Sequence, residues 1–237
     1  MSPPLFLVAD LPDVETVRLD GPEGHHAATV QRLRVGESVV LADGRGTFAA
    51  GVITAVEKGA VAVHLETRSF EAPPDPLLTV LQGIPKGDRG ELAVQAMTEV
   101  GVDAIVPWQA ARSIARWKDD RPLERWRATA REATKQARRA WLPAVSAART
   151  TAQAVTGLPA FSLVLDESAE RPLSRVDLPR AGDIALIVGP EGGIAAEELA
   201  AFTAAGAVPV RLGSSILRTS TAGVAAISAL SVRLGRW

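Results

Sequence analysis

The stretch Ile184-Ala185-Leu186-Ile187-Val188-Gly189-Pro190-Glu191-Gly192-Gly193 is an apolar run that ends abruptly in a glycine-rich loop. An Ala- and Glu-rich segment follows, and a second apolar run, 208–212, then leads into another loop at 213–222. This order of strand, loop, helix, strand and loop predicts parallel strands whose loops emerge at the same edge of one sheet. Ligands of open α/β sheets bind at the carboxyl ends of the strands. We therefore expect function to lie in a pocket between these two loops.

The chain from residue 77 onward alternates between expected strands and helices. We expect strands at Leu77–Ile84, Asp103–Pro107 and Phe161–Leu165, and helices at Glu91–Val100, Leu123–Trp141 and about Ala222–Leu234. Gly101 is suited to end the first of these helices, and Pro143 to stop the second. The alternation predicts an α/β fold with a parallel sheet that carries helices on both faces.

The first 70 residues have a different texture, with short apolar runs separated by turns. Val39–Ala42 enters the turn Asp43-Gly44-Arg45-Gly46 and resumes at Thr47–Ile53, which indicates a hairpin. Val61–Leu65 is a further strand, and Gly24–Leu33 is long enough for one helix. The pattern predicts a small closed or half-closed barrel. Three prolines between residues 73 and 76 suggest a linker, so we expect domains at 1–72 and 73–237.

Composition narrows the class of protein. The chain has 237 residues, 47 % hydrophobic and 22 % charged, which is ordinary for a globular protein. It has no cysteine, so disulfides, thiolate metal sites and cysteine nucleophiles are excluded. No apolar run reaches the roughly 20 residues that span a bilayer, and the N-terminus lacks the pattern of a signal peptide. We expect a cytoplasmic protein without a membrane anchor. The three histidines lack metal-ligand spacing, so no metal is expected.

Charge is unevenly distributed along the chain. The net charge is −1, yet residues 112–139 contain ten Arg or Lys and only four Asp or Glu. Arg127, Arg131, Lys135 and Arg138 are spaced four, four and three residues apart, which places them on one helical face. Such a stripe is most often a solvated surface, but the local excess of cations favours contact with phosphate. Arginine suits that role because its planar fork binds phosphate bidentately.

The two loops of the expected pocket fit neither common nucleotide motif. Gly189, Gly192 and Gly193 permit close approach of a ligand, but their spacing is neither that of a dinucleotide fingerprint nor that of a P-loop. A tight strand-to-helix turn is the plain alternative. In the second loop, Arg218 stands beside hydroxyl residues and an apolar pair, with backbone groups available to a purine edge. We interpret Glu197 and Glu198 as partners of a helix dipole.

The ordered pair of loops, Leu186–Gly193 and Leu212–Ala222, resembles the SPOUT methyltransferases, and within them the small-subunit rRNA uracil-N3 methyltransferase family (RsmE). The similarity covers nearly the whole chain. It departs from the family pattern at Ser220, at Ser214-Ser215, at Ala195 and at Ala137, and the chain also lacks the arginine pair that usually follows the first Met. Further matching segments are Lys86-Gly87-Asp88-Arg89, Thr98–Val102, Arg112-Ser113, Arg125-Trp126, Lys135–Arg139, and His26 followed by Arg32–Gly36.

The resemblance implies a PUA-like N-terminal barrel that helps to hold RNA and a C-terminal domain with a trefoil knot. It also implies S-adenosylmethionine as cofactor, a homodimer, and methylation of N3 of a uridine in 16S rRNA of the small ribosomal subunit. Two alternatives stay open: a SPOUT enzyme that modifies another RNA base or a ribose 2′-hydroxyl, and a non-catalytic RNA-binding protein of ribosome assembly. A nucleotide-dependent oxidoreductase is disfavoured by the glycine spacing.

Residue by residue, the resemblance and the charge pattern predict three sets. The cofactor set is Leu165, Val188, Gly189, Pro190, Gly192, Gly193, Leu212, Gly213, Ser215, Ile216, Leu217, Thr219, Thr221 and Ala222. The RNA set is Arg32, Arg34, Arg112, Arg116, Arg127, Arg131, Lys135, Arg138 and Arg139. Candidates for the chemical step are Arg218, Arg89 and Lys86, which would favour an ionised uracil, and Glu191 or Glu99 as proton acceptor.

Overall fold

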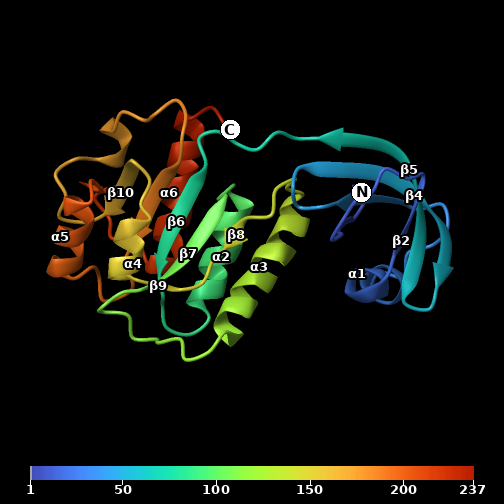
Figure 1. Ribbon diagram of the computed structural model, residues 1–237, viewed down its shortest axis with the longest axis horizontal. Coiled ribbons are helices and arrows are strands. Elements are labelled where there is room, and N and C mark those ends of the chain that lie inside the picture. The colour runs from blue at the N-terminus through green and yellow to red at the C-terminus, as the bar shows by residue number, and fades with distance from the viewer. Residues whose placement is uncertain (1) are drawn as a thin grey trace. The chain divides into compact units, whose positions relative to one another are not determined.

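The computed structural model describes residues 2–237 and divides into two compact units (Figure 1). One unit comprises the chain up to Pro73 together with Thr134–Leu142, and the other comprises Pro74–Ala133 and Pro143–Trp237. Helix α3, Arg121–Ala137, therefore contributes residues to both.

The first unit is built on a five-stranded sheet in the order β1-β3-β4-β5-β2. Its ladders are antiparallel except for the parallel pair of β1 and β3. Phe6, Leu41, Ile53 and Val63 are fully buried in its apolar core, and buried and more exposed residues alternate along β2 and most of β4. The elements are β1 Leu5–Leu7, β2 Thr16–Leu19, α1 Gly21–His25, a π-helical turn His26–Val30, β3 Ser38–Ala42, β4 Thr47–Glu57 and β5 Ala60–Phe70.

The predicted hairpin is confirmed, because β3 and β4 pair in antiparallel register around the turn at 43–46. The carboxylate of Asp43 accepts hydrogen bonds from the backbone amides of Arg45, at 2.7 Å, and Thr47, at 3.0 Å. Partial burial of this carboxyl acts to raise its pKa, but the amide hydrogen bonds outweigh burial and hold the pKa below its usual value. Asp43 is therefore the residue that organises the turn.

The second unit contains a sheet in the order β12-β10-β11-β6-β7-β8. Strand β9 also pairs with β7, further along β7 than β8 does. Every ladder in it is parallel, as the sequence predicted. The carboxyl ends of β6, β10, β11 and β12 consequently meet at one edge. The elements are β6 Leu78–Gly83, α2 Arg89–Glu99, β7 Ala104–Gln109, β8 Ala144–Val145, β9 Arg149–Thr150, α4 Thr151–Thr156, β10 Phe161–Leu165, a 3-10 turn Leu173–Arg175, β11 Ile184–Val188, α5 Ala196–Ala204, β12 Val208–Val210 and α6 Thr219–Arg233.

Helices cover both faces of this sheet, as predicted (Figure 1). On one face Leu81 and Ile187 pack against α4 and α5, where Trp108 and Phe202 meet edge to face with ring centroids 5.0 Å apart. On the opposite face α2 and α6 pack against each other and against the strands. The strands read as continuous apolar runs because both of their faces are buried.

Helix α3 ends at Ala137, four residues before the predicted end at Trp141. Arg138 adopts a left-handed conformation with φ of +55°. Its amide donates to the carbonyl of Lys135, and the amide of Arg139 donates to the carbonyl of Thr134. This pair of bonds is a Schellman motif, which usually uses glycine at the left-handed position. The sequence shows no glycine there, so the stop was not predicted.

Other boundaries also differ from the predictions. Helix α6 begins at Thr219 rather than about Ala222, so residues assigned to the loop form its first turn. The helix predicted at Gly24–Leu33 is α1 followed by a π-helical turn that ends at Val30. The short helix α4 was not predicted, although Thr150 and Gln153 form a capping box at its start. A trefoil knot depends on how one segment of the chain passes through a loop of another, which strand order does not describe. The predicted knot therefore stays a prediction.

No helix within residues 2–237 is long and apolar enough to cross a membrane. Across the same residues, no group of three or more His, Cys, Asp or Glu side chains is placed to hold a metal ion.

Candidate active site

The loop after β11 turns sharply and approaches its neighbours closely. Gly193 has φ of +74°, a conformation that favours glycine. A Cβ on Gly192 would lie 3.0 Å from the Cβ and the carbonyl oxygen of Arg112. At the end of the adjacent strand β6, a Cβ on Gly83 would lie only 2.6 Å from the backbone nitrogen of Pro190. Glycine is thus required both at the end of β6 and in the loop after β11 for this loop to lie against the sheet edge.

The second loop, residues 212–218, leaves its backbone open. Within the described chain, the amides of these residues make no hydrogen bond to other protein groups. Ile216 and Leu217 are 78 % and 41 % exposed, which is unusual for large apolar side chains. The loop therefore offers apolar surface and free polar backbone groups together, a combination suited to a small ligand with a heteroaromatic ring.

A cavity of about 830 Å³ lies between the two loops, at the carboxyl ends of β10, β11 and β12. Every residue of the predicted cofactor set except Thr221 lines it. Among the candidates for the chemical step, Arg218, Arg89 and Glu191 line it as well. The structure therefore gathers residues from four segments of the sequence around one cavity, and that these residues bind a cofactor stays a prediction.

Three predicted residues lie outside the cavity lining. Glu99 is the last residue of α2 and accepts a hydrogen bond from Nε2 of Gln95 at 2.9 Å. Thr221 is in the first turn of α6, where its hydroxyl donates to the carbonyl of Arg218 at 3.1 Å. Lys86 contributes through its backbone, because its amide donates to Oε1 of Glu191 at 3.2 Å, while its side chain is exposed. These three residues are therefore outside the cavity lining, and their roles in cofactor binding and in the chemical step stay predictions.

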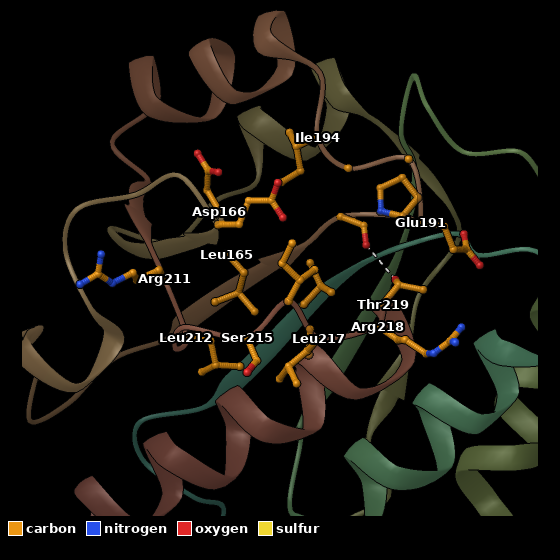
Figure 2. A pocket seen from close by; sticks show the side chains of 18 of the residues that line it. Leu165, Asp166, Glu191, Ile194, Arg211, Leu212, Ser215, Leu217, Arg218 and Thr219 are labelled. Atoms are coloured by element: carbon orange, nitrogen blue, oxygen red, sulfur yellow. Dashed lines mark hydrogen bonds between the residues drawn. The ribbon is translucent and has the colours of Figure 1, made fainter.

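The charged groups of the cavity lie at two ends, with the apolar side chains of Leu165 and Leu217 between them (Figure 2). At one end, Nη1 of Arg89 lies 3.5 Å from Oε1 of Glu191. The guanidinium of Arg218 projects at the same end and has no side-chain partner among residues 2–237. Arg218 is therefore a cation at this end of the cavity with no internal ion pair among residues 2–237.

The opposite end contains residues that the predicted sets missed. Asp166 and Glu167 directly follow β10, and Arg211 directly follows β12. The backbone amide and the hydroxyl of Ser168 both donate to Asp166 at 3.0 Å. These residues could have been found by applying the rule for strand carboxyl ends to β10 and β12 as well as to β11. The other lining residues that were not predicted for the cofactor site are Ile194, Leu199, Ser214 and Arg112.

Glu197 and Glu198 lie in the first turn of α5, as predicted for partners of the helix dipole, and Glu198 also has a second role. Its side chain is buried and accepts three hydrogen bonds, from the amides of Ala111 at 2.8 Å and Ala195 at 3.2 Å and from the hydroxyl of Thr151 at 2.7 Å. The carboxylate thereby joins the start of α5 to α4 and to the segment that carries Arg112. Arg112 in turn donates to the carbonyl of Gly192 at 3.2 Å, so Glu198 supports the wall of the cavity indirectly.

The predicted basic stripe on α3 is only partly exposed. Lys135 is buried and forms an ion pair with Glu23 at 3.2 Å, so the prediction that it contacts RNA phosphate is corrected. Arg138 lies past the end of the helix and donates to the carbonyl of Pro3 at 2.8 Å. Arg127 is exposed but donates to the carbonyl of Val145 and pairs with Glu124.

The remaining residues of the predicted RNA set differ in exposure. Arg131 and Arg139 are half-buried and have interactions within the protein. The side chains of Arg32, Arg34, Arg112 and Arg116 are exposed.

Comparison with known proteins agrees with this architecture. Residues 73–231 match a family model described as an RNA methyltransferase domain, and residues 19–66 match one described as an RNA methyltransferase PUA domain. The chain is 45 % identical to ribosomal RNA small subunit methyltransferase E of Mycobacterium bovis, over 98 % of this chain and 93 % of that protein. It is 30 % identical to the protein of the same name from Bacillus subtilis, over 92 % of this chain and 91 % of that protein.

A solved structure agrees as well. The crystal structure of ribosomal RNA small subunit methyltransferase E from Neisseria gonorrhoeae bound to S-adenosyl methionine superposes with a TM-score of 0.90. The two chains are 30 % identical, and the match covers 98 % of each. The N-terminal sheet and the parallel sheet with its flanking helices are thus the two domains of a known architecture, and this chain belongs to the ribosomal RNA small subunit methyltransferase E family.

Proposed function

We propose that this protein transfers a methyl group from S-adenosylmethionine to N3 of a uridine in 16S rRNA. The observation that carries the proposal is the cavity of about 830 Å³ between two open loops, in a chain whose residues 73–231 match an RNA methyltransferase domain. The relatives named above are small-subunit rRNA methyltransferases, and one of them is solved with the cofactor bound.

The residues around the cavity fit this cofactor. Gly189, Gly192 and Gly193 leave room for a ligand against the backbone, and the unengaged amides at 212–218 can pair with the polar edge of an adenine. Leu165 and Leu217 can cover the faces of the ring. When bound there, S-adenosylmethionine supplies a methyl group on a positively charged sulfur.

Arg218 is the residue that we assign to stabilising the uracil as its N3 proton is lost. The ring becomes negatively charged at that point, and a nearby cation favours this state. Arg89 already pairs with Glu191, and Lys86 does not line the cavity, whereas Arg218 lines it without an internal partner among the described residues. These contacts support the choice of Arg218 over Arg89 and Lys86.

Glu191 is the candidate acceptor for the N3 proton because it is the carboxylate at the same end of the cavity. Its side chain is 21 % exposed and is oriented by Arg89 and by the backbone amide of Lys86. In the transfer, the proton leaves N3, a bond forms between N3 and the methyl carbon, and the bond between that carbon and sulfur breaks. Positioning of the reacting atoms in line supplies much of the rate.

The proposal extends to the partners of the protein. We infer that it acts on rRNA in the context of the small ribosomal subunit, that it works as a homodimer, and that it resides in the cytoplasm. The exposed arginines Arg32, Arg34, Arg112 and Arg116 are then the first candidates for phosphate contact.

The test uses labelled S-adenosylmethionine, this protein and small ribosomal subunits from cells that lack the modification, followed by mapping of the RNA by mass spectrometry. We expect a single N3-methyluridine in 16S rRNA. A methyl group on another base or on a ribose 2′-hydroxyl would contradict the proposed target. Binding of the cofactor without transfer to subunits or to naked rRNA would point to another RNA, and no binding at all would favour a non-catalytic scaffold.

A further inference from the structure

A buried amide lies directly behind the cavity. Gln82, on β6, has no exposed surface, and its neighbours Val80 and Leu81 on the strand are buried apolar residues. Its Nε2 donates to the hydroxyl of Thr219 at 2.9 Å and to the carbonyl of Gly83 at 3.1 Å. Gln82 does not line the cavity, but Thr219 does. The contact therefore joins the interior of the sheet to the first residue of α6.

The hydroxyl of Thr219 continues the chain of hydrogen bonds to the other loop. It donates to the carbonyl of Gly189 at 2.7 Å, the contact drawn as a dashed line in Figure 2. A carbonyl can only accept, so the single hydroxyl proton is used there, and the hydroxyl oxygen must accept from its other neighbour. The side chain at position 82 must therefore be a hydrogen-bond donor. The Gln82 amide is thus the group that matches the polarity of the chain.

The arrangement leaves one polar atom without compensation. Among residues 2–237, Oε1 of Gln82 is buried and accepts no hydrogen bond. A buried unpaired carbonyl is unfavourable, and an apolar side chain of the same size would avoid that cost. Positions that break such a rule tend to serve function. Gln82 therefore makes its two donor contacts at the cost of one buried, unpaired acceptor.

We propose that Gln82 is a positioning residue of the cofactor site, which acts through Thr219 to hold the two loops in register. One loop begins at Gly189 after β11, and the other ends at Thr219 where α6 begins. Gln82 pairs in the sheet with Val188, the residue before Gly189, so the loops share one rigid support. The identity of the ligand, S-adenosylmethionine, rests on the function proposed above.

The test is a double-mutant cycle on the affinity for S-adenosylmethionine, measured by calorimetry on the full chain. Gln82→Met keeps the size of the side chain and removes its donor, and Thr219→Val keeps the shape and removes the hydroxyl. We expect each change to raise Kd about tenfold, which corresponds to loss of one buried hydrogen bond. Because both act on one chain of bonds, the combined variant should bind no more weakly than Thr219→Val alone.

Two further variants separate positioning from general packing. Thr219→Ser keeps the hydroxyl and should bind within about twofold of the unmodified protein. Gln82→Glu has the same shape but can only accept a hydrogen bond when ionised, so it should weaken binding at least as much as Gln82→Met. The control is Ser162→Ala, which removes a buried hydroxyl bond to Pro159 at the amino end of β10 and should leave Kd unchanged.

The outcomes distinguish the two proposals. Binding by Gln82→Met that equals that of the unmodified protein, or a combined loss equal to the product of the single losses, would overturn the role of Gln82. Equal losses of cofactor affinity in Thr219→Ser and Thr219→Val would also overturn it. This comparison is valid even where the Gln82 variants fail to fold. Failure of the unmodified protein to bind S-adenosylmethionine would instead contradict the proposed function.

Discussion

Replacement of Arg218 by alanine should reduce turnover far more than cofactor affinity. Its guanidinium lines the cavity and has no internal partner among the described residues, so its charge is available to the substrate. Two unit charges about 4 Å apart attract by about 1 kcal/mol in water and about 4 kcal/mol near a protein surface. Since Arg218 is exposed before RNA binds, we take an intermediate value of about 2–3 kcal/mol. That energy corresponds to a loss of roughly 30- to 150-fold in kcat.

The assay compares kcat on unmodified small subunits with the Kd for S-adenosylmethionine measured without RNA. Kd should change less than about threefold, and the free energy of unfolding by less than about 0.5 kcal/mol, because no internal contact is lost. Arg218→Lys should recover part of the rate by restoring the charge. The matched control is Arg180→Ala, another exposed arginine, which precedes β11 at the opposite edge of the sheet.

Equal losses of turnover and of cofactor affinity in Arg218→Ala would refute this reasoning. Arg218 would then belong to the binding of the cofactor, and the stabilisation of the uracil would have to come from elsewhere in the site.

Three further predictions concern the stability of the fold. Gly83→Ala places a Cβ 2.6 Å from the backbone of the loop after β11, so it should lower the free energy of unfolding by about 1–3 kcal/mol and weaken cofactor binding, as measured by urea denaturation and calorimetry. Lys135→Met removes the ammonium group that lies 3.2 Å from the buried carboxylate of Glu23 and should cost about 3 kcal/mol in the same denaturation assay, while adding Glu23→Gln should recover part of it. The pKa of Asp43 is lower in the folded protein than in the unfolded chain, so the ionised carboxylate stabilises the fold above the unfolded pKa, and this stabilisation is lost as pH falls through the folded pKa. Asp43→Asn should therefore make the free energy of unfolding depend less on pH below about pH 4.

Each of these three has an outcome that contradicts it. An alanine at Gly83 without effect on either quantity would show that the loop can move away at no cost. A Lys135→Met variant as stable as the unmodified protein would mean that the buried pair contributes nothing net. An acid transition that is unchanged in Asp43→Asn would assign it to other carboxylates.

Local sequence determined most of the secondary structure in the second unit. The strands at 161–165 and 184–188 were predicted to the residue, because fully buried parallel strands appear as uninterrupted apolar runs bounded by turn residues. The hairpin at 43–46 was equally legible, since its residues match the demands of the turn. Helix ends were less legible. Helix α3 ends because Arg138 adopts a left-handed conformation, and an arginine in the sequence does not predict such a conformation.

The sequence by itself also determined which loops form the cavity, because the carboxyl ends of parallel strands must share an edge. Only the tertiary structure decided the state of the individual side chains. Lys135 and Arg127 occupy similar positions in the helical repeat, yet one is buried against Glu23 and the other is exposed. Gln82 and Thr219 are 137 residues apart, and their contact exists only once β6 lies beneath α6. Periodicity reports which face a residue occupies, whereas partners and burial depend on what the rest of the chain brings to that face.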